Sequence, residues 1–264
     1  MKITLLGTGD ATGTPVIGCS CPTCRDALKG GKSQRTRFAI LVESDSGAVL
    51  IDTGPDLRDQ LLKHGTKHID GVIWTHGHYD HFAGFAEFHR VQYNVDVYGL
   101  PETLAYILDY LHFLHPKKHE RKLYEPFELI GLEFTLFEVI HPPVKRSVGV
   151  MVRQGRTKVV ITGDTQRDIP KKSMDLIKEP DLLIADAIVP PTVEVKKHMN
   201  TEEAFELARE IKAKKVIFTH LSHFFKPHDE AAKEFPMGYD GMSFEYPKNQ
   251  VLTYVSPYLS FLEE

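Results

Sequence analysis

The chain has 264 residues, of which 42% are hydrophobic and 26% charged, and its formal net charge is −4. This length allows one large hydrophobic core, and the composition excludes a disordered or fibrous protein. The acidic balance argues against a general nucleic-acid or membrane-surface binder, although it leaves room for a local basic patch. No apolar stretch approaches the length of a membrane span. We therefore expect a single cytoplasmic domain over residues 1–264 that does not associate with membranes.

Apolar runs that end in polar or glycine-containing turns predict a series of strands, and helical periodicity predicts five helices between or after them. The order mixes hairpin-like strand pairs with helices, which favours an α/β protein with sheets covered by helices over a doubly wound sheet. Thr201 is expected to cap the fourth helix, because Glu202 and Glu203 follow in its first turn. Strands are expected at 1–7, 38–42, 48–51, 72–74, 95–98, 134–140, 148–152, 159–162, 182–185 and 216–219, and helices at 56–64, 101–114, 171–178, 201–212 and 228–235.

Residues 111–125, which begin in the last turn of the second expected helix, form a basic, histidine-rich insertion. Two interpretations stay open for this segment. It is either a solvated helix end with a loop, or a lid that faces a substrate. Its charge pattern favours the solvated helix end and loop.

A histidine-rich turn, Thr75-His76-Gly77-His78-Tyr79-Asp80-His81, directly follows the apolar run Val72-Ile73-Trp74. Three imidazoles and a carboxylate within six positions, the pattern HxHxDH, indicate metal binding. Neighbouring side chains along such a turn point apart, so one ion cannot collect all four, whereas two ions can. Imidazole suits zinc and its first-row neighbours, and a carboxylate adds tolerance for manganese or iron. The turn therefore predicts two divalent ions, with ligands among His76, His78, Asp80 and His81.

Three other expected strands also end in a residue that can bind metal. His141 follows the run 134–140, Asp164 follows the run that ends at Gly163, and His220 follows the run 216–219. A lone histidine or aspartate at a strand end is usually structural, but several such endings beside an HxHxDH motif are rarely accidental. The repeated pattern predicts that these three residues complete the metal site.

Together with Asp52 in Ile51-Asp52-Thr53-Gly54, these motifs resemble the metallo-β-lactamase superfamily over nearly the whole chain. The resemblance implies a single-domain αββα sandwich with a dinuclear metal centre between the edges of its two sheets. It also implies that Asp52 orients a ligand instead of binding metal. By the same pattern His76, His78 and His141 hold the first ion, Asp80, His81 and His220 hold the second, and Asp164 bridges them.

Two divalent ions about 3.5–4 Å apart would bind a bridging water, lower its pKa and produce a hydroxide that attacks an electrophile. The departing alkoxide then needs a proton. In the phosphodiesterase branches of this superfamily a histidine in the region of His198 is the general acid, and His198 is not needed as a metal ligand. An exposed loop histidine near a helix cap is the alternative interpretation. We expect His198 and Asp164 to be the catalytic residues.

The three cysteines form a compact CxCxxC cluster, Cys19, Cys21 and Cys24. An odd number at this spacing fits metal thiolates in a reducing compartment better than a disulfide framework. Structural zinc takes four ligands, so one must come from elsewhere in the chain. His223 is the expected fourth ligand, and His228 is the alternative. Such a zinc ion would tie the amino-terminal loop to the segment that carries the last catalytic ligand.

The CxCxxC cluster, the Thr219-His220-Leu221-Ser222-His223 segment, His198 and Gly238–Met242 resemble the branch that contains the phosphoribosyl cyclic phosphodiesterases of phosphonate breakdown. The resemblance implies a metal-dependent phosphoric diester hydrolase that acts on a small phosphodiester, of a cyclic ribose type or a nucleotide. It also implies a homodimer. The donor types themselves predict two catalytic ions, manganese or zinc with iron as a further alternative, and one structural zinc ion.

Three alternatives stay open. The 3′ tRNA-processing ribonucleases share the dinuclear site, but they usually carry a long flexible arm and a strongly basic docking surface, and this acidic sequence shows neither feature clearly; a nucleic-acid partner is disfavoured without being excluded. A lactamase or thioesterase would use the metals but gives His198 no role. The pyrroloquinoline-quinone biosynthesis branch also carries early thiolates and would make the chain a non-catalytic accessory or carrier protein. An oxygen-reducing diiron protein is disfavoured because it would have glutamate in place of His78.

Overall fold

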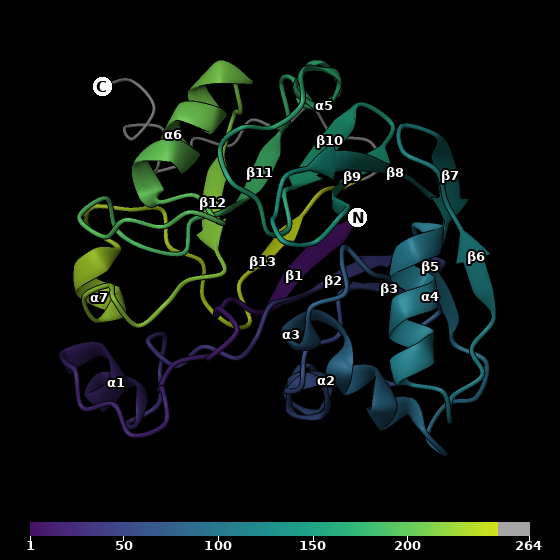
Figure 1. The fold of residues 1–264 in the computed structure, drawn as a ribbon, viewed down its shortest axis with the longest axis horizontal. Helices are drawn as coiled ribbons and strands as arrows, with labels where there is room; N and C mark the ends of the chain where they lie inside the picture. Colours follow the sequence, from purple (N-terminus) through teal and green to yellow (C-terminus); the bar gives the residue numbers. More distant parts are fainter. Residues whose placement is uncertain (248–264) are drawn as a thin grey trace.

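The computed structural model describes residues 1–247, which form two β-sheets with helices over them (Figure 1). A central apolar cluster joins the sheets and contains Ile40 from one and Val150 from the other. A second cluster joins the first sheet to its helices through Leu104, and a third joins the second sheet to its helices through Leu207. The layer order is therefore helix, sheet, sheet, helix, and the predicted αββα sandwich is confirmed. Residues 248–264 of the expected domain lie outside the described part of the chain.

The first sheet has seven strands in the order β13-β1-β2-β3-β4-β5-β6. Its β13, β1, β2 and β3 strands are antiparallel neighbours, whereas β3, β4, β5 and β6 run parallel. Parallel strands carry their carboxyl ends to the same edge of a sheet, which places the loops after β3, β4 and β5 together. The strands are β1 (Lys2–Gly7), β2 (Ala39–Ser44), β3 (Gly47–Ile51), β4 (Gly71–Ile73), β5 (Asp96–Gly99), β6 (Lys118–Glu120) and β13 (Ser243–Glu245).

The second sheet has six strands in the order β12-β11-β10-β9-β8-β7. The β10, β11 and β12 strands are parallel, and β7, β8, β9 and β10 are antiparallel. The loops after β10, β11 and β12 consequently meet at one edge of this sheet. The strands are β7 (Pro126–Leu129), β8 (Leu132–Val139), β9 (Ser147–Gln154), β10 (Thr157–Ile161), β11 (Leu182–Asp186) and β12 (Val216–Thr219).

The helices cover the sheets or cap the loops at the sheet edges (Figure 1). Apolar residues of α2 and α4 pack on the first sheet, and those of α5 and α6 pack on the second. Within residues 1–247, every helix is too short or too polar to cross a membrane. The helices are α1 (Pro22–Ala27), α2 (Leu57–His64), α3 (Tyr79–Phe82), α4 (Pro101–Tyr110), α5 (Lys171–Ile177), α6 (Thr201–Glu210), α7 (His228–Ala231) and the 3₁₀ helix η1 (Ala83–Phe88).

All expected strands are present, each with ends within two residues of the prediction, but three further strands carry no apolar run. These three strands, β6, β7 and β13, lie at sheet edges and are half-exposed along their length. An edge strand buries too few side chains to show the apolar pattern of a central strand. The expected helices 101–114 and 228–235 are four residues too long at their carboxyl ends, since α4 ends at Tyr110 and α7 at Ala231.

The expected Thr201 cap is wrong, because Asn200 caps α6. The Asn200 side chain accepts a hydrogen bond from the Glu203 backbone N–H at 3.0 Å, and the Glu203 carboxylate accepts one from the Asn200 N–H at 2.9 Å. This is a capping box, in which both partners satisfy backbone groups at the helix start. The prediction was one residue late because Thr, like Asn, is a frequent capping residue.

The insertion 111–125 is not a continuous solvated loop, because it contains the edge strand β6. The imidazole of His119 stacks on the ring of Tyr98, with ring centroids 4.6 Å apart. The guanidinium of Arg121 lies over the ring of Phe127, 4.8 Å from its centroid. Two basic residues of this segment therefore pack on aromatic rings of the fold, which makes this part of the insertion an edge of the first sheet.

Candidate active site and cysteine cluster

The expected metal ligands lie just beyond the carboxyl ends of four strands. His76 follows β4, His141 follows β8, Asp164 follows β10 and His220 directly follows β12. Each strand buries an apolar run in the core and so fixes the position of the polar residue that comes after it. The remaining residues of the HxHxDH motif begin the short helix α3, which aims Asp80 and His81 at the same place.

Six imidazoles form a closed ring at this edge of the two sheets. The centroids of successive rings lie 4.2–5.6 Å apart. The carboxylate of Asp164 lies among them, with Oδ2 3.2–3.8 Å from the Nε2 atoms of four of these histidines. In order around the ring, the six are His76, His78, His141, His198, His220 and His81.

The expected ligands fall into two sets that could each hold a metal ion, and the sets share Asp164, while His220 also belongs to a further possible set with Asp186 and His198. Within each set the ligand atoms lie within 4.8 Å of one another. Several of these atoms are buried without any hydrogen-bond partner, among them Nε2 of His76, His81 and His220 and Oδ1 of Asp164. Buried polar atoms in such numbers are costly unless a ligand satisfies them, so the residues present fit two divalent ions. One set is His76, His78, His141 and Asp164, and the other is Asp80, His81, Asp164 and His220.

The charges of the imidazole and carboxylate groups at this site also favour the binding of cations. Burial alone would lower the pKa of His81, but the carboxylates of Asp164, Asp80 and Asp52 raise it well above its ordinary value. Burial likewise opposes a charge on His220, yet Asp164 and Asp80 raise the pKa of this imidazole to about 9. Conversely, His220 and His81 outweigh burial and hold the pKa of Asp164 well below its usual range. The carboxylates thus create a negative site that bound protons or metal ions would neutralise.

Asp52 is fully buried and contacts a histidine of the second set from outside it. Its Oδ2 accepts a hydrogen bond from His81 Nδ1 at 2.6 Å and from Thr75 Oγ1 at 2.7 Å, and its Oδ1 accepts one from the Thr75 N–H at 2.8 Å. A carboxylate on Nδ1 keeps the proton on that nitrogen and leaves Nε2 unprotonated. Asp52 therefore orients His81 with Nε2 facing the cluster.

His198 lies between His141 and His220 in the ring of six imidazoles. Its position is fixed by a residue that sequence reasoning missed. Its Nδ1 is 2.8 Å from Oδ2 of Asp186, which also accepts a hydrogen bond from the Thr165 N–H at 3.0 Å. The His198 ring stacks on that of His220 at 4.9 Å and 14°. Asp186 ends β11, so it carries the same strand-end signal that pointed to Asp164. That signal could have identified it, because it also follows a buried apolar run.

His141 is fixed by the segment that carries His198. Its Nδ1 donates a hydrogen bond to the Lys197 carbonyl at 2.9 Å, while its Nε2 lies 3.1 Å from Nδ1 of His78. The loop between β11 and α6 thus positions the His141 and His198 rings together. A displacement of this loop would move a candidate ligand and a candidate proton donor at the same time.

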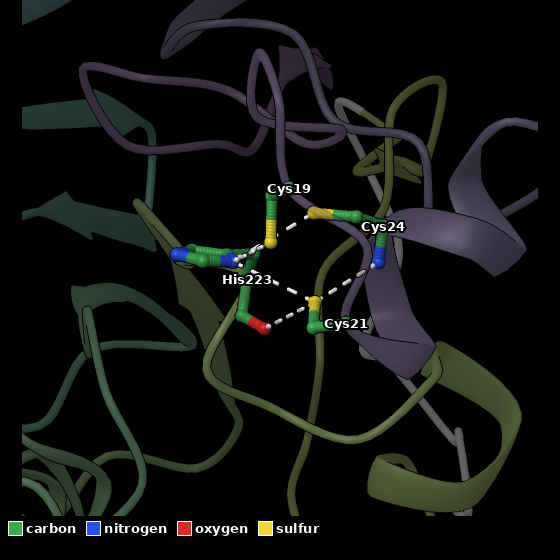
Figure 2. Close-up of side chains that lie close together, drawn as sticks. All are labelled: Cys19, Cys21, Cys24 and His223. Carbon is green, nitrogen blue, oxygen red and sulfur yellow. Dashed lines mark hydrogen bonds between the residues drawn. The ribbon is translucent and has the colours of Figure 1, made fainter.

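The three cysteines and His223 form a second cluster, in which the side chains point at one another (Figure 2). The Sγ atoms of Cys19, Cys21 and Cys24 lie 3.4, 3.6 and 3.7 Å from Nδ1 of His223. Burial alone would raise the pKa of Cys21, but hydrogen bonds from the Cys24 backbone and from His223 lower it to about 6. A low thiol pKa favours the thiolate that metals bind. Three sulfur donors and one imidazole form the donor set of a structural zinc site.

His228, the alternative fourth ligand, lies elsewhere. Its Nδ1 is 3.1 Å from the guanidinium of the buried Arg35, and its backbone N–H donates to Ser33 Oγ at 2.8 Å. A cationic neighbour and a different hydrogen-bond partner leave it outside the thiol cluster. The geometry favours His223, which comes close to the amino-terminal loop because Leu221 pairs with Gly9.

Comparison with known proteins places this geometry in a family. The model of the beta-lactamase superfamily domain matches residues 48–221, a span that includes every candidate catalytic ligand from His76 to His220. A solved diphosphatase from the PhnP family is 29% identical, with a TM-score of 0.84 over 93% of this chain and 96% of that chain. Zinc-bound PqqB from Methylobacterium extorquens is 22% identical, with a TM-score of 0.80 over 93% of this chain and 100% of that chain, and shows a shared fold.

Among curated proteins, an octanoyltransferase from Porphyromonas gingivalis is 29% identical over 262 residues. The match covers 92% of this chain but 51% of that relative, so the chain spans about half of its length. The activity in its name is therefore a property of a longer protein. Because the family model covers most of the chain and the αββα fold agrees with it, the protein belongs to the metallo-β-lactamase superfamily and is similar to its PhnP branch.

Proposed function

We propose that the protein is a metal-dependent phosphodiesterase that hydrolyses a small phosphodiester. The observation that carries this proposal is the His198–Asp186 pair, which lies beside the two ligand sets. In this pair Nδ1 of His198 is 2.8 Å from Oδ2 of Asp186. Hydrolysis of a lactam or thioester needs no additional imidazole at this position. Release of an alkoxide from phosphorus does need a proton donor, and a buried carboxylate holds His198 where it can act as one.

The proposed catalytic ligands are the two sets that share Asp164, with manganese, zinc or iron as the ions. When bound, two such ions supply Lewis-acid activation of the phosphoryl oxygens and lower the pKa of water. Cys19, Cys21, Cys24 and His223 are proposed to hold a third ion, a structural zinc. The three sulfur donors support the assignment of zinc to this cluster, since thiolates bind zinc in preference to manganese and hard cations.

The protein side chains have separable tasks in the proposed reaction. Asp52 holds the proton on Nδ1 of His81, so that Nε2 is free to serve as a ligand. Asp186 accepts a hydrogen bond from the Nδ1–H of His198, which leaves Nε2 as the nitrogen that transfers a proton. In its protonated form His198 gives the Nε2 proton to the leaving oxygen and returns to the neutral state. The Asp186 carboxylate stabilises the charged imidazolium before that transfer.

The comparison with the PhnP-family diphosphatase supports hydrolysis at phosphorus, because that structure matches nearly the whole chain at 29% identity. Relatives below 25% identity, such as PqqB, support the shared fold alone. The phosphodiesterase proposal therefore depends on the site geometry first and on this one relative second.

A substrate screen tests the proposal. Protein reconstituted separately with Mn²⁺ and Zn²⁺ is assayed on cyclic and linear phosphodiesters, phosphomonoesters, lactones and a precursor tRNA. We expect turnover of small phosphodiesters that is lost on chelation and absent for lactones. Preferred hydrolysis of lactones would refute the proposal, and cleavage of the precursor tRNA without turnover of small diesters would favour the ribonuclease alternative.

A further inference from the structure

The candidate metal site opens to solvent beside His78. His78 is half-buried, as is the neighbouring His198, whereas the other members of the two ligand sets are at most 6% exposed. Gly77 follows the buried His76 and precedes His78 in the turn, and it is also half-buried. A side chain that lies against Gly77 is therefore next to the solvent-accessible side of the candidate metal site.

Tyr106 of α4 is the side chain in that position. A Cβ atom on Gly77 would lie 2.7 Å from Cδ1 and 3.1 Å from Cε1 of Tyr106, so the aromatic ring is in direct contact with the metal-binding turn. The contact also explains why glycine occupies position 77. On another side, the Tyr106 ring makes an edge contact with Phe82 at a centroid distance of 6.3 Å.

Most of the Tyr106 side chain is nevertheless accessible. The residue is 60% exposed, and no hydrogen bond of its hydroxyl is found within residues 1–247. An aromatic ring that packs on the fold along one side and is open on the other can accept a second flat ring by stacking. The structural contacts of Tyr106 thus fix its ring without using its exposed surface.

A cationic side chain reaches the same face of α4. Glu102 precedes Tyr106 by four residues, so the two lie on one face of the helix. Arg146 comes from the loop between β8 and β9 that contains His141, and its Nε lies 3.3 Å from Oε1 of Glu102. An aromatic ring beside the metal site, with a guanidinium close by, suits a ligand that combines a flat heterocycle with phosphate.

We propose that Tyr106 is a specificity-determining residue that stacks on the base of a nucleotide substrate. The inference rests on the proposed phosphodiesterase function and narrows its substrate class to nucleotide phosphodiesters, as opposed to base-free sugar phosphates. Stacking of one base on an aromatic side chain contributes about tenfold in affinity. Contacts to the sugar and phosphate are common to both classes, so the base contact alone distinguishes them.

The test compares two ligands that differ by the base alone, adenosine 5′-monophosphate and ribose 5-phosphate. Binding to the Mn²⁺-reconstituted chain of 264 residues is measured by isothermal titration calorimetry. We expect the wild type to bind the nucleotide about tenfold more tightly than the sugar phosphate. Tyr106→Ala should bring the two affinities within about twofold, whereas Tyr106→Phe should keep the preference because it keeps the ring.

Tyr110→Ala is the matched control. Tyr110 lies on the same helix, is 57% exposed, and also contacts Phe82, at 5.2 Å, but the three atoms nearest to a Cβ on Gly77 all belong to Tyr106. The control variant should keep the nucleotide preference. Thermal melting of each variant with metal bound shows whether a loss of binding comes from unfolding, and Tyr106→Phe retains the ring if Tyr106→Ala does not fold.

Two outcomes overturn the inference: a wild type without nucleotide preference, or a preference that Tyr106→Ala keeps. Neither depends on catalysis, since the measurement is of equilibrium binding. The proposed function fails separately, in the hydrolysis screen, if no phosphodiester is turned over. A protein that hydrolyses phosphodiesters but binds both ligands equally would keep the proposed function and refute the role of Tyr106.

Discussion

Replacement of Asp52 by asparagine should lower the metal affinity of the ligand set that contains His81, although Asp52 is not itself a candidate ligand. The backbone of Asp52 has φ of 61°, a left-handed conformation that asparagine tolerates and alanine does not. The new amide would present a donor to Nδ1 of His81, where the carboxylate accepted a bond at 2.6 Å. His81 would then favour the tautomer with its proton on Nε2, the nitrogen 3.2 Å from Asp164. A protonated Nε2 cannot bind metal.

Loss of such an orienting carboxylate costs about 10- to 100-fold in metal affinity, or roughly 1.4–2.7 kcal/mol. The affinity is measured by titrating metal-free protein against a chromogenic chelator, with the metal content checked by mass spectrometry. Asp56→Asn is the control, because Asp56 lies in the same loop but pairs with Arg37 at 3.1 Å, away from the ligands. An Asp52→Asn protein that binds both ions of the two ligand sets as tightly as the wild type would refute the assigned role.

Three further predictions concern the other parts of the structure. His198→Gln should slow hydrolysis of alkyl phosphodiesters by about 10²–10⁴-fold, with little effect on p-nitrophenyl esters, whose leaving group needs no proton, and with both metals still bound; equal losses for both leaving groups would reassign His198. Cys24→Ser should lower the melting temperature, and it should reduce the zinc content by one ion per chain. An unchanged zinc content would refute the proposed zinc site. Burial, with Arg35 and Lys32, lowers the pKa of His228 from 6.5 to about 4. Between pH 6.5 and pH 4, His228 therefore binds a proton in the unfolded chain but not in the folded one. This difference lowers the free energy of unfolding as the pH falls through that range. His228→Gln should reduce the fall in melting temperature over that range, and an identical pH profile would contradict the assignment.

The central strands could be predicted from the sequence because each is a buried apolar run. Val216–Thr219 was expected with the bounds that β12 has in the structure. The edge strand β6 could not be found, because its Lys118–Glu120 sequence is polar and half-exposed. Pairing with β5 keeps it in the sheet. This pairing is a backbone contact that the amino-acid pattern does not encode.

The candidate ligands were recognisable for a related reason. His141, Asp164 and His220 each follow a buried strand, and strands that meet at one edge bring their following residues together. Asp186 was missed although it follows the same pattern, because its role depends on a contact with His198, twelve positions further along the chain. The position of Tyr106 beside the metal-binding turn could not be predicted from the sequence either, since it depends on which face of α4 lies against Gly77. Spacing predicts which elements exist, whereas contacts between loops need the folded structure.

Metal stoichiometry measured together with turnover in Asp164→Ala tests the central claim most directly. Asp164 is the one residue shared by both ligand sets. The wild type should hold two exchangeable divalent ions beside one tightly bound zinc ion and should hydrolyse bis(p-nitrophenyl) phosphate. In Asp164→Ala we expect fewer exchangeable ions, an unchanged structural zinc and no detectable turnover. Full activity with an unaltered metal count in this variant would contradict the dinuclear phosphodiesterase account.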